Sequence, residues 1–92
     1  MSDRMPQMWE HIRTVFSRAA FTRAMFRMPA SLARYWLRGP GAARIRWGTK
    51  GDLTRCARAI RRAARGKIVP GQEWPICQNL HKRRFGVPNP RD

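Results

Sequence analysis

Residues 46–56 read Arg46-Trp47-Gly48-Thr49-Lys50-Gly51-Asp52-Leu53-Thr54-Arg55-Cys56, and a second short string, Cys77-Gln78-Asn79-Leu80-His81, follows after residues 57–76. Each string contains one of the two cysteines in the chain. About fifty residues surround this pair, and a segment of that size buries little apolar surface by itself. The chemical state of the two cysteines therefore decides whether this half of the chain has a fixed shape.

The first cysteine lies in the clearest predicted helix, residues 53–65. Asp52 is suited to cap its N-terminus, and Gly66 ends it. Apolar residues repeat at helical spacing on one face, which includes Cys56. The opposite face is basic, and we expect it to contact an anionic surface through Arg55, Arg58, Arg61, Arg62 and Arg65.

The second cysteine lies in a last predicted helix, which Pro75 opens and which runs to about residue 84. Residues 67–74 form the loop before it. Cys77 and His81 fall on the same side of this helix, and Gly86 is a typical residue at a helix end. The two helices are compatible with a hairpin that brings the cysteines together.

Three states of the cysteine pair remain open. A disulfide between Cys56 and Cys77 would close a loop of about 22 residues and stabilise the fold by roughly 3 kcal/mol. Buried free thiols are the ordinary alternative in a reducing compartment. A zinc site using Cys56, Cys77 and His81 is the third state, but it lacks the fourth ligand that a structural site needs.

Residues 6–28 predict one long amphipathic helix that begins at Pro6 and ends before Pro29. Its apolar stripe widens toward the C-terminal end, which favours contact with another protein. A second helix, residues 32–38, would be capped by Ser31 and carries further aromatic residues. The predicted partner-binding residues are Met8, Trp9, Ile12, Phe16, Phe21, Met25, Phe26 and Trp36.

Gly39-Pro40-Gly41 interrupts the helical pattern. We therefore expect an interaction segment at residues 1–40 and a small cysteine-containing module at residues 41–92. Residues 43–47 are the one plausible extended stretch, and they are too short to build a sheet. The sequence predicts a mainly α fold with a long N-terminal helix, a C-terminal helical hairpin and little or no sheet.

The chain has 92 residues and a formal net charge of +15 at pH 7. Such a charge repels itself and favours an anionic partner. Nearly all of the basic residues are arginine, which binds carboxylates and phosphates through a planar fork. The chain is 42% hydrophobic, too apolar for a disordered basic tail. No apolar run reaches the length of a membrane span, although the Arg-rich, acid-poor first forty residues also imitate an organellar transit peptide.

The sequence offers little for catalysis. It has no paired carboxylates, no Gly-rich phosphate loop followed by Lys-Ser/Thr, and no Ser/His/Asp grouping. Cys77 and His81 could form a dyad, but a nucleophile also needs a cleft. We expect no enzymatic activity, no small-molecule substrate and no cofactor. The arginine face is the natural nucleic-acid candidate, with Trp47 and Trp74 available to stack on bases.

The combined string Trp47-Gly48-Thr49, Gly51-Asp52, Arg55-Cys56, Cys77, Leu80-His81 and Gly86 resembles a small cysteine-containing module of actinobacterial tailed phages, found alone or attached to capsid-assembly proteins. The match covers about forty-five residues, half of the chain. The resemblance implies a virion setting and brings no catalytic residues with it.

This resemblance leads to the expected function of a minor capsid or decoration protein that reinforces a phage shell. The major capsid protein would be the partner, and the N-terminal helix would lie on the shell or on copies of the protein itself. The arginines would pair with acidic capsid surface or make nonspecific contacts with packaged DNA. The alternative function is that of a basic DNA-binding or DNA-condensing protein, whose affinity should collapse as salt rises.

Overall fold

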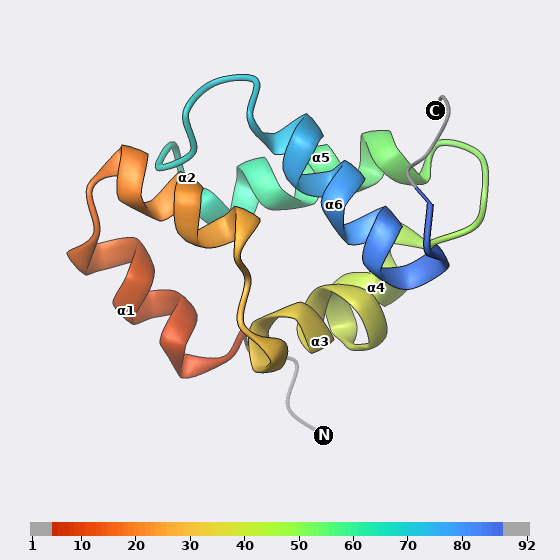
Figure 1. The fold of residues 1–92 in the computed structure, drawn as a ribbon, viewed down its shortest axis with the longest axis horizontal. Helices are drawn as coiled ribbons and strands as arrows, with labels where there is room; N and C mark the ends of the chain where they lie inside the picture. Colours follow the sequence, from red (N-terminus) through yellow and green to blue (C-terminus); the bar gives the residue numbers. More distant parts are fainter. Residues whose placement is uncertain (1–4, 88–92) are drawn as a thin grey trace.

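Helices make up most of the chain in this computed structural model, which describes residues 5–87 (Figure 1). No strand occurs within that range. The prediction of a mainly helical fold is therefore confirmed. In chain order the helices are α1 (Gln7–Val15), α2 (Arg18–Phe26), α3 (Ala30–Arg38), α4 (Pro40–Ile45), α5 (Asp52–Ala64) and α6 (Glu73–Phe85).

The long N-terminal helix predicted at residues 6–28 is wrong, because the chain breaks between α1 and α2. Phe16 has extended backbone angles, and the Ser17 hydroxyl accepts a hydrogen bond from the Ala20 amide at 3.2 Å. Ser17 thus acts as a helix cap, which favours a new helix start over continuation. In one straight helix Trp9 and Phe21 would lie about 18 Å apart along the axis. The break lets their rings meet edge to face, with centroids 5.3 Å apart.

The second N-terminal helix starts earlier than predicted. Pro29 is the residue before α3, and Ser31 makes no capping hydrogen bond. The Ser31 hydroxyl instead contacts the Met8 sulfur at 3.7 Å, so it links α3 to α1.

The extended stretch predicted at residues 43–47 is also wrong. Pro40 occupies the first turn of α4, where its missing amide hydrogen costs nothing, and the helix ends at Arg46 in a left-handed conformation. Gly41 is needed for packing: a Cβ there would lie 2.7 Å from Trp36 Cε3. The glycine that looks like a helix breaker in the sequence instead lets α4 approach α3 closely.

Local interactions fix both ends of the segment that joins α4 to α5. The predicted cap Asp52 is instead the first residue of α5, after Gly51, and its carboxylate accepts the Gly48 amide hydrogen at 2.9 Å. Arg55 Nε donates to the Ile45 carbonyl at 2.7 Å. The Trp-Gly-Thr string is thus a loop tied to the first turn of α5.

Helix α6 begins two residues before the predicted Pro75 and ends at Gly86, which adopts the expected left-handed conformation with φ of 83°. The α6 helix lies against α5, and it also contacts α2 and α3 (Figure 1).

The core is one continuous cluster that draws on both halves of the chain. The radius of gyration is 12.2 Å, which matches the roughly 12 Å of a compact domain of this length. The cluster crosses the boundary predicted at residues 39–41, where Trp47 Nε1 donates to the Trp36 carbonyl at 2.8 Å. The largest fully buried side chains are Phe21, Met25, Leu32, Ile45, Ile60, Ile76, Leu80, Cys56 and Cys77.

Candidate anion-binding site

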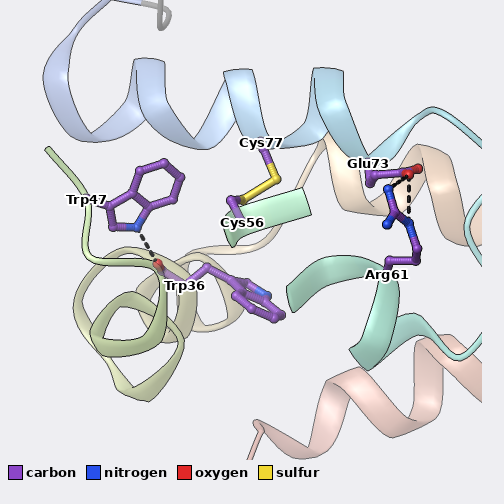
Figure 2. The surroundings of a disulfide bond; sticks show 6 residues. All are labelled: Trp36, Trp47, Cys56, Arg61, Glu73 and Cys77. Carbon is purple, nitrogen blue, oxygen red and sulfur yellow. Dashed lines mark hydrogen bonds and ion pairs between the residues drawn. A yellow bond between two sulfur atoms is a disulfide. The ribbon is translucent and has the colours of Figure 1, made fainter. Parts of the chain in front are cut away.

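The two cysteines form a disulfide in the middle of the core (Figure 2). Their Cα atoms are 6.0 Å apart, and neither residue is exposed. Of the three states that the sequence left open, the structure contains the disulfide. A bonded pair offers no thiolate, so the zinc alternative with His81 has lost two of its ligands. Within residues 5–87, no three His, Cys, Asp or Glu side chains gather where they could hold a metal.

His81 takes a structural place beside the disulfide-bonded helices. Its ring packs on Trp47 and Phe85, with centroid distances of 6.1 and 4.6 Å. Its Nδ1 lies 2.7 Å from the Val87 carbonyl. Trp47 is buried, so of the two tryptophans predicted to stack on bases only Trp74, 39% exposed, is accessible.

Most of the predicted partner-binding residues lie inside the molecule. They fill the space between α1, α2, α3 and α6, where they stabilise the protein's own fold. This fold therefore does not offer the predicted docking face as a surface. Met8 is exposed and Phe16 and Phe26 are half-buried, whereas the buried members of the set are Trp9, Ile12, Phe21, Met25 and Trp36.

The five arginines predicted on the outer face of α5 divide into two groups. Arg55 is occupied by the loop before the helix, where it donates to the Ile45 and Lys50 carbonyls and to the Thr49 hydroxyl. Arg61 forms an ion pair with Glu73 at the start of α6. Within the described range, the side chains of the other three form no hydrogen bond or ion pair, so their charge is available to an anion; they are Arg58, Arg62 and Arg65.

The Arg61–Glu73 pair joins α5 to α6 (Figure 2). Glu73 is 5% exposed, and burial by itself raises the pKa of its carboxyl group. Hydrogen bonds from Arg61 and from the Gly71 amide, together with the Arg61 charge, outweigh burial, and the pKa is lowered below its ordinary value of 4.5.

This lowered pKa makes the fold sensitive to acid. Ionised Glu73 stabilises the fold above its ordinary pKa, and this contribution is lost as the pH falls through the lower folded value.

We expect Glu73→Gln to lower the free energy of unfolding by about 1 kcal/mol at pH 7, and to lower it less at pH 3. Urea denaturation at both pH values measures this difference. Glu10→Gln, which alters an exposed pair with Arg13, is the control and should change little. An equal loss at both pH values for Glu73→Gln would contradict this role.

A cleft of about 450 Å³ opens where α1, α3, α4 and α5 meet. Its apolar wall includes Trp9, Tyr35 and Trp36, which come from two helices of the N-terminal half. Its polar wall is overwhelmingly basic, with Glu10 as the acidic residue. The lining arginines are Arg13, Arg44, Arg55, Arg58, Arg62 and Arg65.

Two residues of this cleft have buried donor atoms without an acceptor in the described part of the chain. They are the Nε of Arg13 and the Nε1 of Trp36. A buried donor without a partner costs about 1–3 kcal/mol, so native proteins seldom retain one. The cleft is thus lined by positive charge, and two of its lining residues have a buried donor without a partner.

The sequence identified the α5 part of this cleft and missed the rest. Arg13 and Arg44 are 42 and 11 residues before Arg55, the first arginine of α5, and only the packing of α1 and α4 against α5 brings them to the cleft. No local pattern in the sequence predicts that arrangement. Trp9 and Trp36 of the aromatic wall are instead predicted from the sequence to bind a partner.

No family model, curated protein or solved structure matches this chain. The resemblance to the phage module therefore stays a prediction. Within residues 5–87, every helix is too short or too polar to cross a membrane.

Proposed function

We propose that this protein binds nucleic acid through the phosphate backbone, without reading base sequence. The observation that carries the proposal is the arginine surface around α5, where Arg58, Arg62 and Arg65 have no partner in the described structure and adjoin the basic wall of the cleft. The net charge of +15 supports it, because such a protein attracts polyanions over long range.

The choice of a phosphate polymer over a protein or a lipid surface depends on where the apolar residues lie. A membrane-surface helix or a shell-docking helix needs an exposed apolar face. The apolar faces of α1 and α2 are turned into the core through Trp9, Phe21 and Met25. Arginine supplies most of the accessible binding chemistry, and its fork matches the oxygens of a phosphate.

The minor-capsid function, the major capsid protein as partner and the virion location remain predictions from the resemblance. The docking residues on which that function depended are largely buried. Contact with packaged DNA is the part of that prediction that this proposal retains.

Salt dependence tests the proposal. About four phosphate contacts give a slope near −3.6 in a plot of log affinity against log salt, so affinity for duplex DNA should fall about 100-fold between 50 and 200 mM salt. Fluorescence anisotropy with a labelled 20-base-pair duplex (roughly 65 Å long, longer than the protein) measures it. Two unrelated duplex sequences should bind within about threefold of each other. Affinity that is insensitive to salt, or the absence of binding at 50 mM, would contradict the proposal.

A further inference from the structure

The cleft between α1, α3, α4 and α5 is a hollow in the basic surface, and it is more enclosed than a second basic hollow, which is lined by Arg38, Arg46 and Arg84. Arginines from three helices converge on one volume of about 450 Å³. That is within the range of roughly 300–1,000 Å³ found for small-molecule sites. Arginines that only face solvent would not require an enclosed volume of this size.

The charges in the cleft are unbalanced. Glu10 is the acidic side chain in its lining, and it is already paired with Arg13 at 2.6 Å. Arg58 and Arg62 are four residues apart, so they project from the same face of α5. An anion that enters the cleft therefore meets two neighbouring guanidinium groups that no described carboxylate neutralises.

Two lining residues of the cleft also have buried side-chain donors without a partner in the described structure. Trp36 is 2% exposed, and its Nε1 has no acceptor among residues 5–87. Its carbonyl is already used by Trp47, and Figure 2 shows the indole on the other side, away from Trp47. The buried Nε of Arg13 is the second donor. Both donor atoms are shielded from solvent, so the binding chemistry of the cleft comes from the guanidinium groups that line it.

We infer that this cleft is a specific site for a phosphoryl anion, held by Arg58, Arg62 and Arg13. The phosphoryl group comes from the backbone of a bound nucleic acid or from a free di- or triphosphate; the chemistry is the same. Arginine binds such a group with two parallel hydrogen bonds, which a point charge does not provide. This inference deepens the proposed function and rests on it for the nucleic-acid source.

Titration of the oxidised full-length protein with pyrophosphate tests the site, with calorimetry and ¹H–¹⁵N NMR as readouts. We expect the Trp36 indole and Arg13 Nε signals to shift on binding, while the indole of Trp74 on α6 does not. The variant Arg58→Gln/Arg62→Gln should weaken pyrophosphate binding at least tenfold.

The matched control is Arg23→Gln/Arg34→Gln, which removes the same charge from exposed positions on α2 and α3 outside the cleft. It should weaken binding less than twofold. Equal losses in the two double variants would show a general charge effect and overturn the site, as would failure of the wild-type protein to bind pyrophosphate. Circular dichroism checks that both variants fold.

Duplex DNA binding by the same variants separates this site from the proposed function. DNA binding without pyrophosphate binding would overturn the site and leave the function standing. Pyrophosphate binding without DNA binding would support the site, assign it to a free phosphate ligand and end the proposed function. Displacement of DNA by pyrophosphate would support the backbone as the source.

Discussion

Phe21→Ala is expected to lower the free energy of unfolding by about 3–5 kcal/mol. Phe21 is completely buried, and its ring packs edge to face against Trp9 at 5.3 Å. The substitution removes that contact and leaves a cavity between α1 and α2. Domains of this size unfold with only about 5–15 kcal/mol, so the loss is a large part of the total. Urea denaturation followed by circular dichroism measures it.

Val15→Ala is the matched control, because Val15 is 63% exposed on α1. Its effect should stay within about 0.5 kcal/mol of zero. A Phe21→Ala variant as stable as the control would mean that the N-terminal helices contribute nothing to the core. That result would favour the prediction that residues 1–40 are an interaction segment for another protein.

Removal of the disulfide is expected to cost about 3 kcal/mol, through the greater conformational entropy of the unfolded chain. In the double variant Cys56→Ala/Cys77→Ala this corresponds to a fall in Tm of roughly 10–20 °C. Differential scanning calorimetry of the variant and of the wild-type protein measures the fall.

A reducing agent provides the control for the disulfide. It should lower the Tm of the wild-type protein toward that of the double variant and leave the Tm of the double variant unchanged. A wild-type Tm that does not respond to complete reduction, verified by thiol titration, would contradict a stabilising role for the disulfide.

The elements that sequence analysis predicted well are those with complete local signals. Helix α5 has an acidic residue at its start, an apolar face that includes Cys56, and Gly66 just beyond its end. Helix α6 ends at Gly86 as predicted, because a left-handed end residue strongly favours glycine. In both cases, local propensity and tertiary packing agree.

The N-terminal break was missed because the apolar stripe continues through it. A local signal was present: Phe16 and Phe21 flank Ser17 at the positions of a hydrophobic staple around a helix cap. The apolar stripe was also read as a surface for another protein. Which apolar face is covered by the chain itself depends on how α1 and α2 fold back, and periodicity carries no information about that.

The candidate site was predictable only in part, for a related reason. The spacing of Arg58 and Arg62 places them on the outer face of α5. Spacing does not reveal that Arg61 meets Glu73, or that Arg55 is occupied by the preceding loop. Nor does it place Arg13 beside α5. These pairings are tertiary, so they follow from the packing of helices and not from the sequence near each arginine.

The central claim is that both halves of the chain form one cooperative core, with the arginines left outside for a polyanion. Native-state hydrogen exchange of the oxidised Phe21→Ala variant, without any partner, tests it most directly. We expect the amides of Ile76 and Leu80 in α6 to lose as much protection as those in α2. Unchanged protection in α6, with α2 exchanging freely, would contradict it.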